Sequence, residues 1–182
     1  MTNPTLATIA ERFSCRGYED KKIEIEKLTA IARAGLQSPS AKNLQPWRII
    51  VIKDKEVVDK IDAAATSRIN ANLPAGQEPR KNIFFDAPAV FLILKDTNAQ
   101  SNWVDIDCGI VTQNIALAAH SMGVDNVIVA MASHAFLSDE AEALKKRLDW
   151  PAGFDFGMAV ACGYGNTKKE PHEIDWDKMS FV

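Results

Sequence analysis

Ser38–Trp47, with the sequence SPSAKNLQPW, connects a predicted helix to a predicted strand. Its two prolines stiffen the backbone, because proline fixes its own φ and restricts the residue before it. Ser40, Asn43 and Gln45 add hydroxyl and amide groups to the segment. A rigid loop with such donors and acceptors could bind the edge of a planar heterocycle. The other interpretation is an ordinary helix-to-strand connection whose polar side chains cap its own backbone, and the residues alone leave both open.

The elements on either side of this loop follow from the spacing of apolar residues. Glu24–Leu36 carries them near helical spacing, and Trp47–Lys53 is a β-branched run typical of a strand buried on both faces. The same criteria predict further helices over Thr5–Arg12, Asp54–Thr66, Asp105–Met122 and Ser138–Leu148, further strands over Pro88–Lys95, Val127–Met131 and Phe154–Tyr164, and a loop over Ser67–Asp86. Strands separated by long helical stretches favour an α+β fold, arranged as a three-layer α-β-α sandwich.

The longest predicted helix, Asp105–Met122, is apolar around most of its circumference. A helix of this kind must be buried centrally or packed against another chain. Gly123 follows it directly, and glycine just past the end of a helix is a common stop, since it adopts the left-handed conformation without a Cβ penalty.

Length and composition indicate a globular protein and exclude several functional classes. The chain has 182 residues, 47% of them hydrophobic and 25% charged, which suits one domain over residues 1–182. A net charge of −3 provides no basic surface for nucleic acid or an anionic membrane. Apolar runs such as Ala89–Leu94 are strand-sized, and Met1–Ala10 lacks a secretory pattern, so we expect no membrane partner and a cytoplasmic location. Three scattered cysteines and three scattered histidines predict neither a disulfide framework nor a metal site.

A second polar cluster lies near the N-terminus, in the segment Arg12–Arg16 (RFSCR). On an extended backbone, Arg12, Ser14 and Arg16 point to the same side. Guanidinium forks and a hydroxyl suit phosphate or carboxylate oxygens, so this side could form an anion pocket. The pattern is short and also arises by chance, so a solvated turn is the favoured interpretation of these residues alone.

Four isolated side chains are candidates either for a role in a site or for packing. Trp103 and Phe136 could line a substrate site, but core packing is the favoured interpretation. His134 could deliver a proton, but this is not the favoured interpretation. Cys108 is expected to act as a small apolar residue on a buried helix face.

The loop and three other segments, taken in order, resemble the nitroreductase superfamily. The loop matches the central motif Pro-Ser-Ala-x-Asn-x-Gln-Pro-Trp, and Ile9–Tyr18 resembles the Arg-x-Ser-x-Arg-x-Tyr opening of that family. Asp107–Gly123 is similar to its central dimerisation helix, and Gly157–Gly165 to its late strand ending in Gly-Tyr-Gly. The resemblance extends over nearly the whole chain.

This resemblance implies the nitroreductase-like FMN-binding fold in a domain-swapped homodimer, with two FMN molecules at the interface. Arg12, Ser14 and Arg16 would bind the phosphate, the ribityl chain and the pyrimidine edge of FMN, and Arg16 would also tune the flavin by stabilising its reduced form. No side chain is expected to act as a catalytic acid, base or nucleophile, because the flavin carries the chemistry. Residues 170–182 would form a C-terminal tail that packs on the partner subunit.

Further cofactor contacts follow from the same resemblance. Four loop residues of the partner chain would pack on and bond the isoalloxazine, namely Pro39, Ser40, Ala41 and Asn43. A backbone amide at Val129 or Ala130 would donate to flavin N5 or O4. Many members carry Gly or Glu at the position of Ala130, whose N–H can still donate if its backbone angles are ordinary. Lys168 or Lys169 matches the basic residue that helps to hold the phosphate.

The activity implied is that of an FMN-dependent oxidoreductase. It would take electrons from NADH or NADPH and pass them, in a ping-pong scheme, to a nitroaromatic, a quinone or a similar small-molecule acceptor. A member that reduces enones, removes halogen or consumes its flavin is an alternative of the same class. A flavin-binding carrier or sensor would bind FMN without oxidising NADH, and a purely structural dimer would be colourless.

Overall fold

The fold is built on an antiparallel sheet. In the computed structural model, which describes residues 3–170 and 173–182, four strands pair in the order β1-β2-β4-β3. The strands are β1 (Trp47–Ile52), β2 (Ala89–Asp96), β3 (Asp125–Ile128) and β4 (Phe154–Gly163). The two longest strands, β2 and β4, lie at the centre and pair with Ala89 opposite Cys162 at one end and Asp96 opposite Phe154 at the other.

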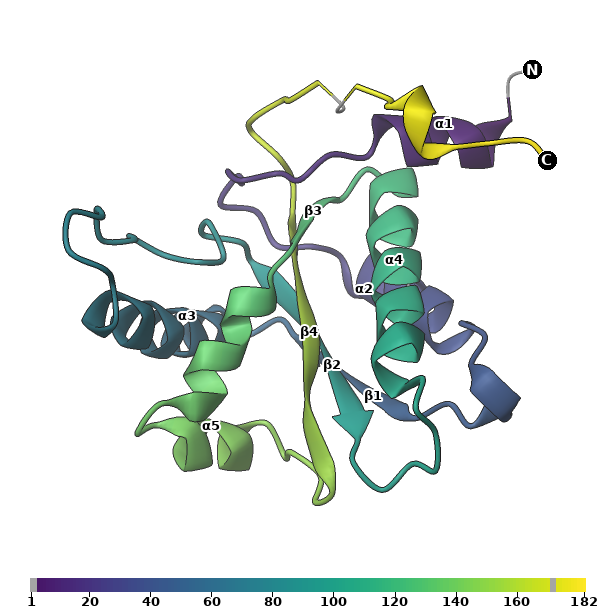
Figure 1. The fold of residues 1–182 in the computed structure, drawn as a ribbon. Coiled ribbons are helices and arrows are strands. Elements are labelled where there is room, and N and C mark those ends of the chain that lie inside the picture. The colour runs from purple at the N-terminus through teal and green to yellow at the C-terminus, as the bar shows by residue number, and fades with distance from the viewer. Residues whose placement is uncertain (1–2, 171–172) are drawn as a thin grey trace.

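Helices cover both faces of this sheet, as Figure 1 shows. α2 (Ile25–Leu36) and α4 (Val104–Ser121) lie on one face; on the other lie α3 (Lys55–Ala71), the 3₁₀ helix η2 (Ala130–Leu137) and α5 (Ala141–Arg147). The buried apolar side chains form two clusters, and alternate residues of β2 divide between them. The α+β fold and its three layers, predicted from the sequence, are confirmed.

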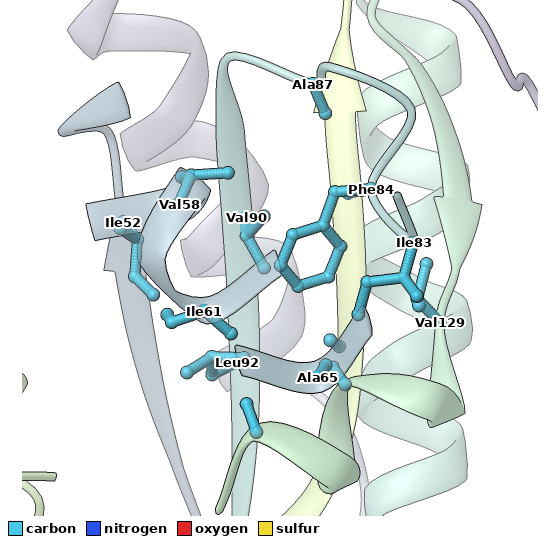
Figure 2. Close-up of a cluster of buried hydrophobic side chains, with 14 of the residues drawn as sticks. Ile52, Val58, Ile61, Ala65, Ile83, Phe84, Ala87, Val90, Leu92 and Val129 are labelled. Carbon is cyan, nitrogen blue, oxygen red and sulfur yellow. The ribbon is translucent and has the colours of Figure 1, made fainter. Parts of the chain in front are cut away.

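The cluster between α3 and the sheet also includes the loop before β2. Figure 2 shows Val58 and Ile61 of α3 and Phe84 of that loop gathered near Val90 and Leu92 of β2. These side chains are buried completely or almost completely. Burial of a large aliphatic or aromatic side chain contributes about 1.5–3 kcal/mol relative to exposure. The loop that leads into β2 is therefore anchored by its own side chains.

α4 ends as its sequence predicts. Gly123 has a φ of +70°, its N–H donates to the His120 carbonyl at 3.0 Å, and the Val124 N–H donates to the Ala119 carbonyl at 2.9 Å. This pair of bonds is typical of a Schellman motif. In the described part of the chain, no helix combines the length and apolarity needed to cross a membrane.

Short helical segments occur near both termini and in the loop before β1. They are α1 (Pro4–Glu11), η1 (Ala41–Asn43) and η3 (Trp176–Lys178). The Asn3 side chain caps α1 by accepting hydrogen bonds from backbone N–H groups of its first turn. Figure 1 places α1 and the C-terminal segment beyond the C-terminal end of α4.

Three elements differ from the prediction. β1 lies at the edge of the sheet, so its middle residues are half-buried and not buried on both faces. α3 continues past Thr66 to Ala71, because no helix breaker occurs before Pro74, and the predicted loop after it is correspondingly shorter. β3 begins at Asp125 and ends before the segment expected to continue it, where η2 begins.

Candidate functional site

Residues 12–16 form an extended segment beside β3. Ser14 makes a parallel bridge with Asn126, and the Cys15 N–H donates to the Asn126 carbonyl at 3.0 Å. Cys15 is fully buried, and Phe13 packs against the same apolar cluster. Side chains alternate along an extended backbone, so the opposite side presents the three residues expected to bind an anion. They are Arg12, Ser14 and Arg16.

Arg12 carries a donor without an acceptor. The residue is half-buried, and its Nη1 atom is buried with no hydrogen-bond partner among the described residues. Leaving a buried donor unsatisfied costs about 1–3 kcal/mol, and more when the group is charged. A guanidinium presents its N–H groups in a fork that matches phosphate or carboxylate oxygens. The position of Arg12 therefore fits an anionic ligand group.

Arg16 is exposed and rests against an aromatic ring. Its Nη1 donates to the Ser14 carbonyl at 3.4 Å, and its guanidinium carbon lies 5.9 Å from the centroid of the Phe85 ring. This distance is within the range of a cation–π interaction. The sequence did not single out Phe85, because the stretch that contains it shows no recognisable motif.

The Ser38–Trp47 loop is held partly by bonds within itself. Ser40 Oγ accepts from the Gln45 N–H at 2.9 Å, and Gln45 Nε2 donates to Asn43 Oδ1 at 3.2 Å. Asn43 and Gln45 have φ values of +54° and +48°. The polar side chains thus cap their own loop, as one of the two interpretations holds. Pro39 and Asn43 nevertheless remain exposed for contact with another molecule.

Two side chains of α4 form hydrogen bonds that hold this loop against the rest of the protein. Asp107, which is 2% exposed, accepts from the Ala41 N–H through Oδ1 at 3.0 Å. Asn114 Nδ2 donates to Ser38 Oγ at 2.9 Å. The Oδ2 atom of Asp107 is buried and has no partner in the described part of the chain. Sequence reasoning missed this anchoring role, for which the available signal was a carboxylate within a largely apolar helix.

The Ser38–Trp47 loop and residues 12–16, the arginine segment, lie at opposite ends of α4. Asp107, near the start of α4, holds the loop, whereas residues 12–16 run beside β3, which follows the end of α4 at Ser121. An α-helix rises about 1.5 Å per residue, so these two points on α4 are about 20 Å apart. In Figure 1 the loop that leads into β1 lies near one end of α4, and β3 follows the other end. One chain does not bring the two predicted halves of the site together.

Of the two residues predicted to supply an amide, Ala130 is the better placed. It is exposed and begins η2, and the N–H of the first residue of a helix has no partner within that helix. Its φ is not positive, so alanine fits the position. Val129 is buried, and its N–H donates to the Ala159 carbonyl at 2.8 Å. The contact of either residue with a cofactor stays a prediction.

Lys168 and Lys169 lie near the start of the arginine segment. Together with Glu11 and Phe13 they line a hollow of about 620 Å³. The assignment of the lysines to a phosphate stays a prediction.

The four isolated candidate side chains differ in their burial. Phe136 is buried, with its ring centroid 4.6 Å from that of Trp150, which confirms core packing. Core packing is wrong for Trp103, which is 57% exposed because it lies just before α4, outside the layers. Cys108 is buried as expected, and burial raises the pKa of its thiol to about 11. His134 Nδ1 is buried and finds no partner within the described ranges.

Comparison with known proteins identifies relatives along nearly the whole chain. Residues 9–164 match the family described as "Nitroreductase family". The chain is 30% identical over 174 residues to an Archaeoglobus fulgidus protein named "Putative NADH dehydrogenase/NAD(P)H nitroreductase". That match covers 93% of this chain and 90% of the relative.

Solved structures show the same fold. The crystal structure of a nitroreductase with bound FMN from Desulfitobacterium hafniense superposes with a TM-score of 0.92 and is 39% identical, over 100% of both chains. A nitroreductase with bound FMN from Bacteroides fragilis superposes with a TM-score of 0.88 over 100% of both chains. Its sequence identity is 21%, so this second likeness concerns the fold alone.

Proposed function

The chain belongs to the nitroreductase family, and on that basis we propose that it is an FMN-dependent oxidoreductase that transfers electrons from NADH or NADPH to a small acceptor. One observation in the chain carries the cofactor assignment. The buried Nη1 of Arg12 has no acceptor among the described residues, and it lies on the side of the segment shared with Ser14 and Arg16. A phosphate group would supply the missing acceptor.

The residues of the chain would bind and orient the cofactor, and FMN, when bound, would supply the redox chemistry. Arg12 and Ser14 would hold the phosphate and ribityl groups. Arg16 would keep a positive charge at the pyrimidine edge, where a preorganised cation stabilises incoming negative charge by on the order of a few kcal/mol. The Ala130 N–H would donate a hydrogen bond to the ring edge. This arrangement requires no acid, base or nucleophile from a side chain.

The acceptor we propose is a nitroaromatic, a quinone or a similar flat molecule. The donor nucleotide and the acceptor would use the same site in turn, which gives ping-pong kinetics. Family membership and the name of the Archaeoglobus relative support this assignment.

We further propose a domain-swapped homodimer. The Ser38–Trp47 loop and the arginine segment lie at opposite ends of α4, so a second copy would supply four loop residues to the flavin site, namely Pro39, Ser40, Ala41 and Asn43. Large apolar side chains stand exposed around the loop and the start of α4, which is unusual for a surface that meets only water. They are Leu36, Leu44, Trp103 and Ile106.

We also propose a single-domain protein located in the cytoplasm. Residues 1–182 would form one domain, with the tail 170–182 packed on the partner. Trp176 and Phe181 of this tail are 66% and 91% exposed, which supports a partner contact, and residues 171–172 lie outside the described part of the chain. Cys15, Cys108 and Cys162 are all free thiols, as suits a cytoplasmic protein.

The visible spectrum of the purified protein tests the proposal, followed by anaerobic addition of NADH. We expect flavin bands that bleach with NADH and return when a nitroaromatic or a quinone is added. Yellow protein that neither NADH nor NADPH bleaches would contradict the oxidoreductase assignment and favour a flavin-binding carrier or sensor. Colourless protein that also fails to bind added FMN would overturn the cofactor assignment.

A further inference from the structure

The loop that precedes β2 adopts a backbone conformation that its sequence does not favour. Phe85 and Asp86 have φ values of +56° and +64°, and the Ala87 N–H donates to the Phe84 carbonyl at 3.1 Å. Two successive positive φ values closed by such a bond are typical of a type I′ turn, which favours Asn, Asp and Gly. A bulky residue such as Phe85 is conformationally strained at this position.

The surroundings impose this strained turn. Asp62, a buried residue of α3, accepts from the Ile83 N–H at 3.0 Å and from the Phe84 N–H at 2.8 Å. Figure 2 shows the Ile83 and Phe84 side chains in the apolar cluster, with Ala87 at the far end of the turn, and all three residues are fully buried. The residues before the turn are therefore held by hydrogen bonds from their backbone N–H groups to Asp62. Buried side chains hold the chain on both sides of the turn. Strain of this kind persists only where the surrounding structure imposes it, and it occurs often at active sites and ligand clamps.

The strained turn places the Phe85 ring beside Arg16. Phe85 is half-buried, and the guanidinium carbon of the otherwise exposed Arg16 lies 5.9 Å from its centroid. An aromatic face restricts a guanidinium without occupying its N–H groups, which remain able to donate in the plane. A carboxylate in the same place would instead neutralise the charge and consume the donors.

We propose that Phe85 is a positioning residue for Arg16. Its ring, held in place by the turn that Asp62 anchors, preorganises the guanidinium for the pyrimidine edge of FMN. This inference rests on the proposed function. A preorganised cation loses less conformational entropy when the cofactor binds, so both the affinity for FMN and the potential of the bound flavin depend on Phe85.

A double-mutant cycle measured by titration of the apoprotein with FMN tests this inference. Phe85→Leu weakens FMN binding about two- to tenfold, which is the value of one cation–π contact. Phe85→Tyr keeps wild-type affinity, because the aromatic face is retained. In an Arg16→Gln background Phe85→Leu has no further effect, since the ring acts through the guanidinium. The midpoint potential of bound FMN is lower in Phe85→Leu than in the wild type.

A second variant separates positioning from folding. Asparagine tolerates the left-handed region, so the Phe85→Asn apoprotein keeps a thermal midpoint near that of the wild type while it loses affinity for FMN. Equal losses of affinity in the Arg16 and Arg16→Gln backgrounds would overturn the inference and leave the proposed function standing. Wild-type protein that does not bind FMN would overturn the proposed function, and the inference with it.

Discussion

Arg12 combines a half-buried position with a donor that lacks a partner among the described residues. Arg12→Met removes this donor and keeps an apolar stem, so we expect the free energy of unfolding of the apoprotein to stay the same or to rise. FMN binding should weaken about 10- to 100-fold, because a hydrogen bond to a charged group is worth about 1.5–3 kcal/mol. Urea denaturation and FMN titration measure the two quantities. Arg48→Met, at an exposed residue of β1, is the matched control, and unchanged FMN affinity in Arg12→Met would contradict the assignment.

The buried thiol of Cys108 makes the stability of the protein depend on pH. Burial, reinforced by the nearby Asp105 carboxylate, raises the pKa of its thiol from 9.0 to about 11. The folded protein therefore holds this proton more tightly than the unfolded chain does. The corresponding stability is complete below pH 9 and is lost as the pH rises from 9 through about 11.

We expect the free energy of unfolding of the wild type to fall over this interval by about 2 kcal/mol more than that of Cys108→Ala. Urea denaturation at pH values across the interval measures the difference. Parallel curves for the two proteins would show that the folded structure does not shift this thiol.

At the scale of elements, the end of α4 rests on the conformation of one residue. Gly123 has a φ of +70°, and a Cβ added there would meet nothing within 4 Å, so any cost of substitution is conformational and not steric. Gly123→Ala should destabilise the protein by about 1 kcal/mol, and Gly123→Asn by less, because asparagine tolerates left-handed angles. The midpoints of urea denaturation measure both. Alanine as stable as glycine at this position would refute the helix-end argument.

Whether a segment forms a helix or a strand could largely be predicted from local sequence. Its position in the sheet and its burial could not. The apolar spacing of α2 and α4 and the aliphatic runs of β2 and β4 predicted their types. The position of β1 at the sheet edge was not predictable, since the order of strands depends on pairings between residues distant in sequence.

At the scale of the whole molecule, the proposed dimer accounts for the apolar surface near the start of α4. Ile106 is 56% exposed there. In a symmetric dimer each substitution acts twice, so Ile106→Glu should raise the dimer dissociation constant at least about 100-fold, given about 1.5–3 kcal/mol per buried side chain. Sedimentation equilibrium measures this constant, and FMN binding should be lost with the dimer. Ser67→Glu, which adds the same charge on α3, should leave the dimer intact, and equal behaviour of the two variants would contradict this interface.

The candidate site was predictable to the extent that its residues are neighbours in sequence. Arg12, Ser14 and Arg16 alternate along one short segment, and the Pro39–Asn43 loop is a continuous motif. Phe85 and Asp107 escaped prediction. Each acts on a residue far away in sequence, Phe85 on Arg16 and Asp107 on Ala41. Such contacts leave no periodic or local signal.

The sequence by itself determined the types of the main elements, the Gly123 helix end, the two polar segments and the family resemblance, because each depends on residues close together along the chain. The tertiary structure alone decided the edge position of β1, the strained turn beneath Arg16 and the separation of the two polar segments along α4. The physical reason is that strand pairing, burial and ring-to-cation contacts are set by packing between distant segments. Local sequence restricts that packing without specifying it.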